Sequence, residues 1–267
     1  MCLNLVHKKS TKSVRSFDEV FESHKKSWHQ VWETSNIEIE GDARDQRNVR
    51  FNLFHLIQMG NKNNPKVCIG SRGLTSEMHY GNSFWDTEIF ILPFFLHSDP
   101  DAAKALVHFR YLTLPQAKAK AKRLWFEGAM FPWMSSYPGY EQADYWEYAN
   151  IAVHVVSDVI YGLMSYYAAT ADVRYMLDHG LELLIETSRF WKSRVEIDNH
   201  GKSIIMINVK GPNEYDGVVN NNTYTNWMAR WNLVQAKKMI AWAKKKHPQA
   251  YKKVAQKLRF NEREINV

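Results

Sequence analysis

The sequence predicts an all-α protein built as an array of helical hairpins. Most of its 267 residues fall into segments whose apolar positions recur at helical spacing. Strand signals are confined to residues 37–39 and 204–209, and strands do not alternate with helices as a parallel sheet requires. Hairpins of this kind close into a toroid, in which the functional side chains lie in the loops at one end.

Each expected helix has a start signal or an apolar face. Ser16 and Glu19 form a capping-box pattern at the first, and Pro100, Pro115 and Pro248 stand at the beginning of three later ones. The expected helices cover residues 16–33, 44–58, 86–97, 101–112, 114–126, 150–169, 171–194, 224–243 and 248–258.

The composition describes a chain that can bury a core. Apolar residues make up 45% and aromatic residues 13%, which excludes a disordered chain. No window approaches 18 consecutive apolar residues, so we expect no membrane span, and the first nine residues have the wrong order for a secretory signal. Cys2 and Cys68 show neither metal nor disulfide spacing. We therefore expect a cytoplasmic protein without a metal or cofactor.

The net charge of +7 is concentrated near the C-terminus. The Lys and Arg residues of 237–259 are interspersed with apolar positions such as Ile240 and Val254, as on an amphipathic helix. We interpret them as a solvated helix face. Nucleic-acid binding is a distant alternative, because the segment carries no reading motif, and no nucleic-acid partner is expected.

The segment Phe84-Trp85-Asp86-Thr87-Glu88 is the most informative part of the chain. Two carboxylates beside a large ring pack poorly, because each buried charge needs its own partners. They suit a sugar, since the indole covers the apolar face of a pyranose while the carboxylates accept hydrogen bonds from its hydroxyls. The segment therefore predicts a binding site for a neutral polyol.

A second polar cluster follows the strand-like run. Residues 211–216 are Gly-Pro-Asn-Glu-Tyr-Asp, and three asparagines follow at 220–222. The Gly-Pro turn places Glu214 at the end of a rigid element. A carboxyl that aromatic rings shield there can have a raised pKa and donate a proton to a leaving oxygen. Glu214 is therefore a candidate general acid, and helix capping or loop fixing is the alternative role.

A third cluster, residues 128–148, is aromatic and acidic without a hydrophobic period, and contains Glu141, Trp146 and Glu147. Such a stretch lines a carbohydrate cleft or forms an interface loop. His154 lies on an otherwise apolar helix, where a satisfied histidine of the core or rim is the simpler interpretation. No His, Cys and Asp set has zinc spacing, and no phosphate-binding glycine loop occurs.

Together the clusters make the chain resemble glycoside hydrolase family 65, the disaccharide phosphorylases of α-glucosides, over about residues 16–260. The motif at residues 211–226 is similar to that of the maltose-phosphorylase-like branch of the family. The motifs are Gly-Leu-Thr-Ser-Glu at 73–77, Phe-Trp-Asp-Thr-Glu at 84–88, Arg-Tyr-Leu-Thr-Leu-Pro-Gln-Ala at 110–117, Gly-Ala-Met-Phe-Pro at 128–132, Arg-Phe-Trp-Lys-Ser-Arg at 189–194, and Gly-Pro-Asn-Glu-Tyr with Asn-Asn-Asn-Thr-Tyr-Thr-Asn at 211–226.

The resemblance implies an (α/α)6 barrel and an inverting phosphorolysis that releases β-glucose 1-phosphate and a free sugar. It implies Glu214 as the general acid and Trp85 and Asp86 as ligands of the glucose at the cleaved bond, with Glu88 as structural support. One carboxylate suffices, because inorganic phosphate, the co-substrate, is already an anionic nucleophile. Further substrate-binding positions implied by the resemblance are Glu141, Trp146, Glu147 and His154.

The chain departs from the family pattern in two ways. Maltose phosphorylases carry His and Glu where this chain has Ala143 and Tyr145, so we do not expect the acceptor to be a 4-linked glucose by default, and a 3- or 2-linked glucobiose or another acceptor is open. The family's N-terminal β-sandwich and its C-terminal sugar- and phosphate-binding segments are not found. We therefore expect an irregular leader over residues 1–15 and an incomplete barrel over 16–267, with weak or no phosphorolysis by itself.

Two other functions stay open. A non-catalytic sugar-binding remnant would bind glucosides through Trp85 and Asp86 without forming product. A hydrolase of the same family would need a second carboxylate as general base. The family also suggests a homodimer, and uncovered apolar faces of an incomplete toroid would favour aggregation or a partner.

Overall fold

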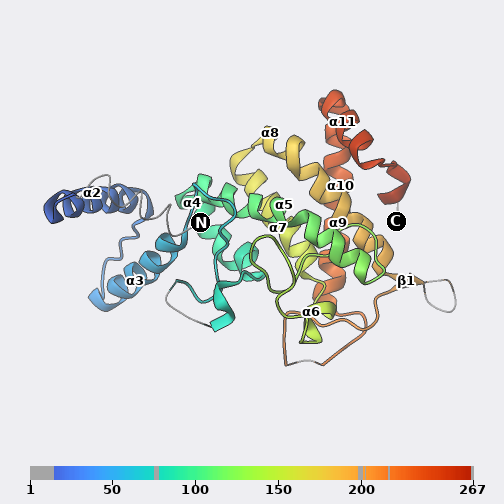
Figure 1. The fold of residues 1–267 in the computed structure, drawn as a ribbon, viewed down its shortest axis with the longest axis horizontal. Coiled ribbons are helices and arrows are strands. Elements are labelled where there is room, and N and C mark those ends of the chain that lie inside the picture. The colour runs from blue at the N-terminus through green and yellow to red at the C-terminus, as the bar shows by residue number, and fades with distance from the viewer. Residues whose placement is uncertain (1–14, 75–77, 198–200, 202, 216, 266–267) are drawn as a thin grey trace, which may run out of the picture. The chain divides into compact units, whose positions relative to one another are not determined.

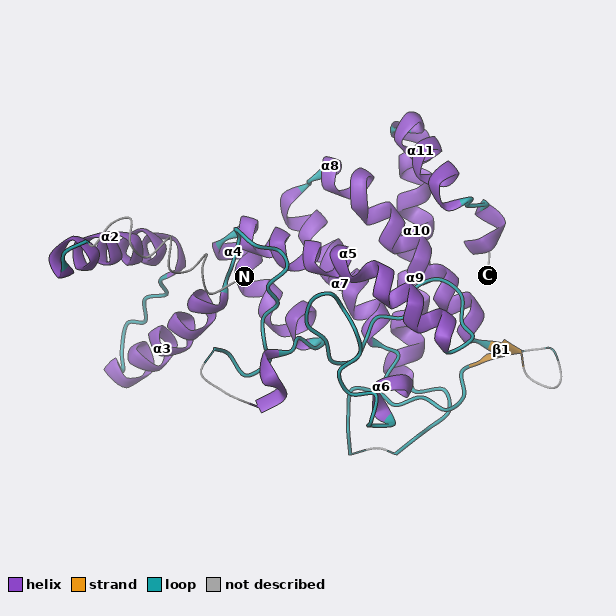
Figure 2. Ribbon diagram, in the orientation of Figure 1, coloured by secondary structure: helices purple, strands orange, loops and turns teal. Residues whose placement is uncertain are grey.

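The computed structural model describes residues 15–74, 78–197, 201, 203–215 and 217–265. Their fold is all-α apart from two short strands (Figure 2). The chain divides into two compact units, residues 1–55 and 56–267. Within the described ranges, no helix has the length and apolar character that crossing a membrane would require.

The elements follow one another in this order: α2 (Phe17–Ser35), α3 (Ala43–Met59), α4 (Leu92–Ser98), α5 (Pro100–Arg123), α6 (Tyr148–Ile151), α7 (Val155–Thr170), α8 (Val173–Tyr175), α9 (Leu181–Arg194), β1 (Glu196–Ile197), β2 (Ile204–Ile205), α10 (Thr223–Lys246) and α11 (Pro248–Leu258). Single π-helical turns, Thr87–Ile91 and Met176–Gly180, lead into α4 and α9, and short 3-10 turns cover Met78–Gly81 and Glu262–Ile265.

In the first unit, the predicted capping box is confirmed at the start of α2. The Ser16 hydroxyl accepts the Glu19 N–H, and the Glu19 carboxylate accepts the Ser16 N–H at 2.8 Å. The segment after α2 is irregular, so the predicted strand at 37–39 is wrong. The side chain of Gln46 takes both the N–H of Ile39 and the C=O of Ile37, the groups that a neighbouring strand would otherwise pair.

The second unit is built on α5, α7, α9 and α10, which pack against one another (Figure 1). Ile160, Leu163 and Leu183 are fully buried among these helices. The burial of apolar side chains from all four elements supplies the main driving force for this unit. Short α6 and the loops around it lie at one end of the long helices (Figure 1).

Helix α5 corrects the prediction of two separate helices at 101–112 and 114–126. It runs without a break through Pro115, although proline removes one helical hydrogen bond and crowds the preceding turn. Leu114 and Ala117, on either side of the proline, are buried. Tertiary packing along the whole helix therefore outweighs the local preference for a break.

The predicted strand at 204–209 is shorter in the structure. Residues 204–205 pair antiparallel with 196–197, and Val209 forms an isolated bridge with Val219. Between them Asn208 has a φ of 52°, in the left-handed region, which interrupts the extended run.

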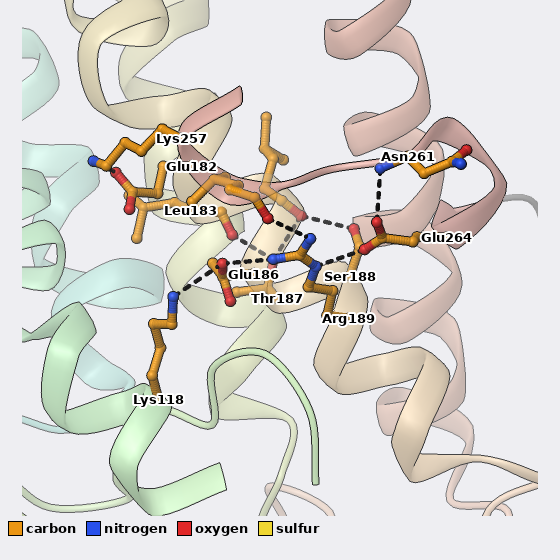
Figure 3. A network of polar contacts seen from close by, with 12 residues as sticks. Lys118, Glu182, Leu183, Glu186, Thr187, Ser188, Arg189, Lys257, Asn261 and Glu264 are labelled. Atoms are coloured by element: carbon orange, nitrogen blue, oxygen red, sulfur yellow. Dashed lines mark hydrogen bonds and ion pairs between the residues drawn. The ribbon is translucent and has the colours of Figure 1, made fainter. Parts of the chain in front are cut away.

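Arg189 connects α9 to the C-terminal elements (Figure 3). Its Nε donates to Glu264 at 2.6 Å and its Nη2 to the C=O of Leu258 at 2.9 Å. Its Nη1 donates to Glu186 at 3.0 Å, and Lys118 of α5 donates to the same carboxylate. This network links α5, α9 and the segment after α11.

Candidate active site

Glu88 anchors the Trp-Asp motif in the core. Arg110 of α5 grips its carboxylate through Nε and Nη2 at 2.6 and 2.8 Å, and Nη2 also donates to the C=O of Phe84. Both side chains are almost fully buried. A buried carboxylate needs such a bidentate partner. The structural role expected of Glu88 is therefore confirmed, and the preceding Trp85 and Asp86 are held at the start of a π-helical turn.

Asp86 is half-buried, unlike Glu88. Burial raises the pKa of its carboxyl, while its own backbone N–H and the charges of His79 and Arg72 act in the opposite direction. Asp86 is therefore a carboxylate whose ionised form is partly disfavoured, as suits a group that gains hydrogen bonds when a ligand arrives.

Trp85 packs against His154, and Asp158 holds the imidazole in place. The rings of Trp85 and His154 meet edge to face, with centroids 5.1 Å apart. His154 Nδ1 lies 2.7 Å from the Asp158 carboxylate, which also accepts the hydroxyl of Tyr224 at 2.8 Å. Burial, followed by the Asp158 charge, raises the pKa of Tyr224, so its hydroxyl stays a donor.

Sequence reasoning missed Asp158 and Tyr224. The signal for Asp158 was available, because a spacing of four residues places it on the same helical face as His154. Tyr224 lies within the Asn-rich block, where nothing local distinguishes a hydrogen-bond donor from a packing residue. Only the tertiary structure brings its hydroxyl to Asp158.

One small pocket joins the three polar clusters of the sequence. Trp85 comes from the first cluster, Glu214 comes from the second, and His154 follows the third along the chain. Of the predicted site residues, these three line the same pocket. The remaining lining residues are Trp133, Tyr148, Ala152, Lys210, Gly211 and Pro212.

Glu141 does not line this pocket, and its carboxylate forms hydrogen bonds with other groups of the protein. Its side chain is 1% exposed, and its carboxylate accepts Lys120 Nζ at 2.5 Å and the backbone N–H groups of Trp133 and Met134 at 2.7 and 3.0 Å. A third backbone N–H, that of Ala143, donates at 3.3 Å. The Glu141 carboxylate therefore holds the aromatic loop through these contacts, and the substrate contact expected of Glu141 stays a prediction.

The other predicted positions surround the pocket without lining it. Trp146 packs on Trp133 and Tyr148, with ring centroids 4.8 and 5.0 Å apart, and so supports two lining residues. Glu147 is exposed on the same loop. Their contacts with substrate, and that of Asp86, stay predictions.

Within the described part of the chain, no group of three or more His, Cys, Asp or Glu side chains is arranged to hold a metal ion. The groups that line the pocket include indole rings, an imidazole, an ammonium and a carboxyl group. Such a set is chemically suited to a polyhydroxy ligand.

The long helices, with a pocket beside the loops that connect them, define an all-α domain built of helical hairpins. The family model "Glycosyl hydrolase family 65 central catalytic domain" matches residues 50–266, and the chain belongs to this family. A solved structure named "Putative kojibiose phosphorylase from human microbiome" superimposes with a TM-score of 0.89 at 34% identity, over 97% of this chain and 38% of that one. The predicted family and all-α, (α/α)6-barrel fold class are thereby confirmed.

Curated relatives give the same result. The chain is 36% identical over 265 residues to kojibiose phosphorylase of Halothermothrix orenii, covering 94% of this chain and 34% of that protein. It is 39% identical over 250 residues to α,α-trehalose phosphorylase of Thermoanaerobacter brockii, covering 93% and 32%. Maltose phosphorylase of Bacillus subtilis is 33% identical over 235 residues, covering 86% and 31%. The chain spans about a third of the length of the curated relatives that it matches.

Proposed function

We propose that this chain carries the glucose-binding and proton-donating part of an inverting disaccharide phosphorylase. Its substrates are an α-linked glucobiose and inorganic phosphate, and its products are β-glucose 1-phosphate and a free sugar. The observation that carries the proposal is the single pocket that joins Trp85, His154 and Glu214 from three distant segments. The similarity to kojibiose, trehalose and maltose phosphorylases supports the same class of reaction.

In this proposal Glu214 protonates the glycosidic oxygen while phosphate attacks the anomeric carbon from the opposite face. The acid is exposed at the pocket, where it can reach a leaving oxygen. The indole of Trp85 covers the apolar face of the glucose ring. The Asp86 charge, nearby in sequence, stabilises the oxocarbenium-like transition state. Phosphate takes part as a co-substrate, and no metal or organic cofactor is needed for these steps.

His154 supplies a directed hydrogen bond in the same scheme. Its Nδ1 faces Asp158 at 2.7 Å, which leaves the Nε2 side of the ring for a sugar hydroxyl. The acceptor sugar is proposed only as a class. Ala143, one of the two positions that depart from the maltose pattern, is buried, while Tyr145 is largely exposed. We therefore treat 2-, 3- and 4-linked glucobioses and trehalose as candidate substrates.

We also place the protein in the cytoplasm. Cys68 is a free, partly buried thiol, which agrees with a reducing compartment. A homodimer stays a prediction from the family.

The test measures binding and turnover on the same preparation. Kojibiose, nigerose, maltose and trehalose are each titrated by calorimetry and then incubated with and without phosphate. We expect binding of at least one disaccharide that Trp85→Ala abolishes, and slow, phosphate-dependent release of β-glucose 1-phosphate that Glu214→Gln abolishes. Glu127→Gln, which removes an exposed carboxyl outside this pocket, is the control for Glu214→Gln in the turnover assay.

The other outcomes identify the alternatives. Binding that depends on Trp85 without any product would indicate a sugar-binding remnant. Release of glucose without phosphate would indicate a hydrolase. Neither heat nor product with any of the four sugars would remove the proposal.

A further inference from the structure

We propose that Lys210 is a positioning residue that ties the turn carrying Glu214 to α6 and the aromatic loop. Lys210 is 1% exposed, although lysine is rarely buried to this degree. The inference rests on the proposed function only in naming Glu214 as the acid. The physical tie itself is tested independently of activity.

The buried ammonium makes contacts on both sides of the pocket wall. Nζ donates to the backbone C=O of Glu214 at 2.7 Å, and it lies 3.8 Å from the centroid of the Tyr148 ring. The Lys210 N–H also donates to the C=O of Ile151, at the end of α6, at 3.0 Å. A desolvated ammonium is costly unless such partners compensate it, and a cation over an aromatic face is favoured most where water is excluded. Lys210 therefore holds the acid turn and α6 together.

The turn that carries Glu214 follows Lys210 closely along the chain. It belongs to a loop that two backbone hydrogen bonds between Val209 and Val219, each 2.9 Å long, close at its base. Beyond that base, Gly211 packs so closely on the Asn222 side chain that a Cβ would collide with it. Glu214 itself lies in a turn outside any helix or strand. The Lys210 bond to its carbonyl is thus a direct restraint on the backbone of the acid.

Helix α6, which Lys210 contacts, is itself held by α5. Lys120, on α5, donates to the C=O of Ala149 within α6 at 2.9 Å and to Glu141 at 2.5 Å. Two buried ammonium groups therefore connect α5 to α6 and α6 to the acid turn. This arrangement fixes Glu214 relative to Tyr148, whose ring lines the same pocket.

The consequence for catalysis is geometric. A general acid must lie within hydrogen-bond reach of the oxygen that it protonates, and small displacements of a catalytic group reduce the rate strongly. Lys210 acts on the backbone of Glu214, so losing it should misplace the acid while leaving the sugar contacts of Trp85 in place. The turnover number should fall and the Michaelis constant should change little.

The test is hydrogen–deuterium exchange of the whole chain, read in peptides that cover residues 209–219. Lys210→Met is compared with the wild type and with Lys238→Met, a control at an exposed position on α10. We expect exchange in these peptides to rise roughly tenfold or more in Lys210→Met, because a hydrogen bond to a charged donor is lost. Exchange in α7 and α9 should be unchanged, and Lys238→Met should match the wild type.

Two more variants keep the result decisive if Lys210→Met does not fold. Lys210→Arg keeps a cationic donor and should restore most of the protection, and Tyr148→Leu removes only the ring face and should give an intermediate increase. Protection at 209–219 equal to wild type in Lys210→Met, or in Tyr148→Leu if the former is unfolded, would overturn the proposal. Where phosphorolysis is detected, a lower turnover number with an unchanged Michaelis constant in Lys210→Met supports the tie. An absence of turnover in the wild type counts against the proposed function and leaves the exchange result valid.

Discussion

The buried pair of Lys120 and Glu141 offers the sharpest test of how the aromatic loop is held. Glu141→Gln keeps the size of the side chain and one carbonyl oxygen for the backbone N–H groups of the loop. It removes the negative charge 2.5 Å from the Lys120 ammonium, whose side chain is 5% exposed. Burial already lowers the pKa of Lys120, and the Glu141 charge is the main influence that opposes this shift. The variant therefore leaves a buried cation without its counter-charge.

The size of the effect follows from that burial. Breaking a buried ion pair by removing one partner costs about 3–5 kcal/mol in the free energy of unfolding. For a chain of this size, that corresponds to a fall of roughly 6–20 °C in the melting temperature. An exposed pair would change the melting temperature far less, because water replaces the lost partner.

The loss in the free energy of unfolding of Glu141→Gln should depend on pH in one direction. In the variant the pKa of Lys120 in the folded state falls further below its ordinary value of 10.5, so between the two values the unfolded chain binds more protons. The free energy of unfolding of Glu141→Gln should therefore recover, relative to the wild type, as pH rises towards 10.5. Lowering the pH should not produce this recovery.

Thermal unfolding followed by circular dichroism at several pH values measures both effects. Glu147→Gln is the matched control, because it makes the same change at an exposed position of the same loop. A melting temperature of Glu141→Gln equal to that of Glu147→Gln would refute the reasoning. It would mean that the carboxylate does not compensate Lys120.

Three further predictions concern the site and the C-terminal elements. Burial raises the pKa of Asp86, so the stability that this group contributes is present below about pH 3.8 and is lost as pH rises through its folded-state pKa. Asp86→Asn should therefore be at least as stable as the wild type at pH 7, measured by urea unfolding, and should bind glucobiose less tightly, measured by calorimetry. A variant less stable than the wild type would disprove this. Asp158→Asn should lower the free energy of unfolding in urea by about 1–3 kcal/mol, because the amide cannot accept from both His154 and Tyr224. It should also weaken disaccharide binding, since His154 is no longer held in place. An unchanged affinity would argue against the orienting role of Asp158. Burial and the hydrogen bond to Glu262 raise the pKa of Tyr251 to about 12. Its stabilising contribution is therefore complete below pH 10 and is lost as pH rises towards 12. Tyr251→Phe should lose less stability than the wild type over that range, and an identical dependence of stability on pH would contradict this.

Several features were predictable because they depend on neighbours in the chain. The capping box at Ser16 and the helical periodicity of most segments are local properties, and the structure confirms them. The structural role of Glu88 was predictable in kind, since a carboxylate next to apolar residues must be paired if it is buried. Its partner, Arg110 on α5, was not identified from the sequence.

Other features depend on contacts between segments far apart in the chain. Local rules placed a break at Pro115 that packing removes, and a strand at 37–39 whose polar groups Gln46 satisfies instead. The contact between Glu141 and Lys120 is another example, because an acidic residue in an aromatic loop can face either a ligand or a buried lysine. Spacing along the chain does not distinguish the two.

By itself, the sequence determined that the protein is helical, that it belongs with glycoside hydrolase family 65, and which side chains suit a sugar and a proton transfer. These are consequences of periodicity and of residue chemistry, both of which are readable in short segments. Only the tertiary structure decided that Trp85, His154 and Glu214 share one pocket, that Asp158 orients the histidine, and that Lys120 and Lys210 hold the loops. Burial and hydrogen bonding across distant segments set these roles, and no local pattern specifies which distant group a buried charge will meet.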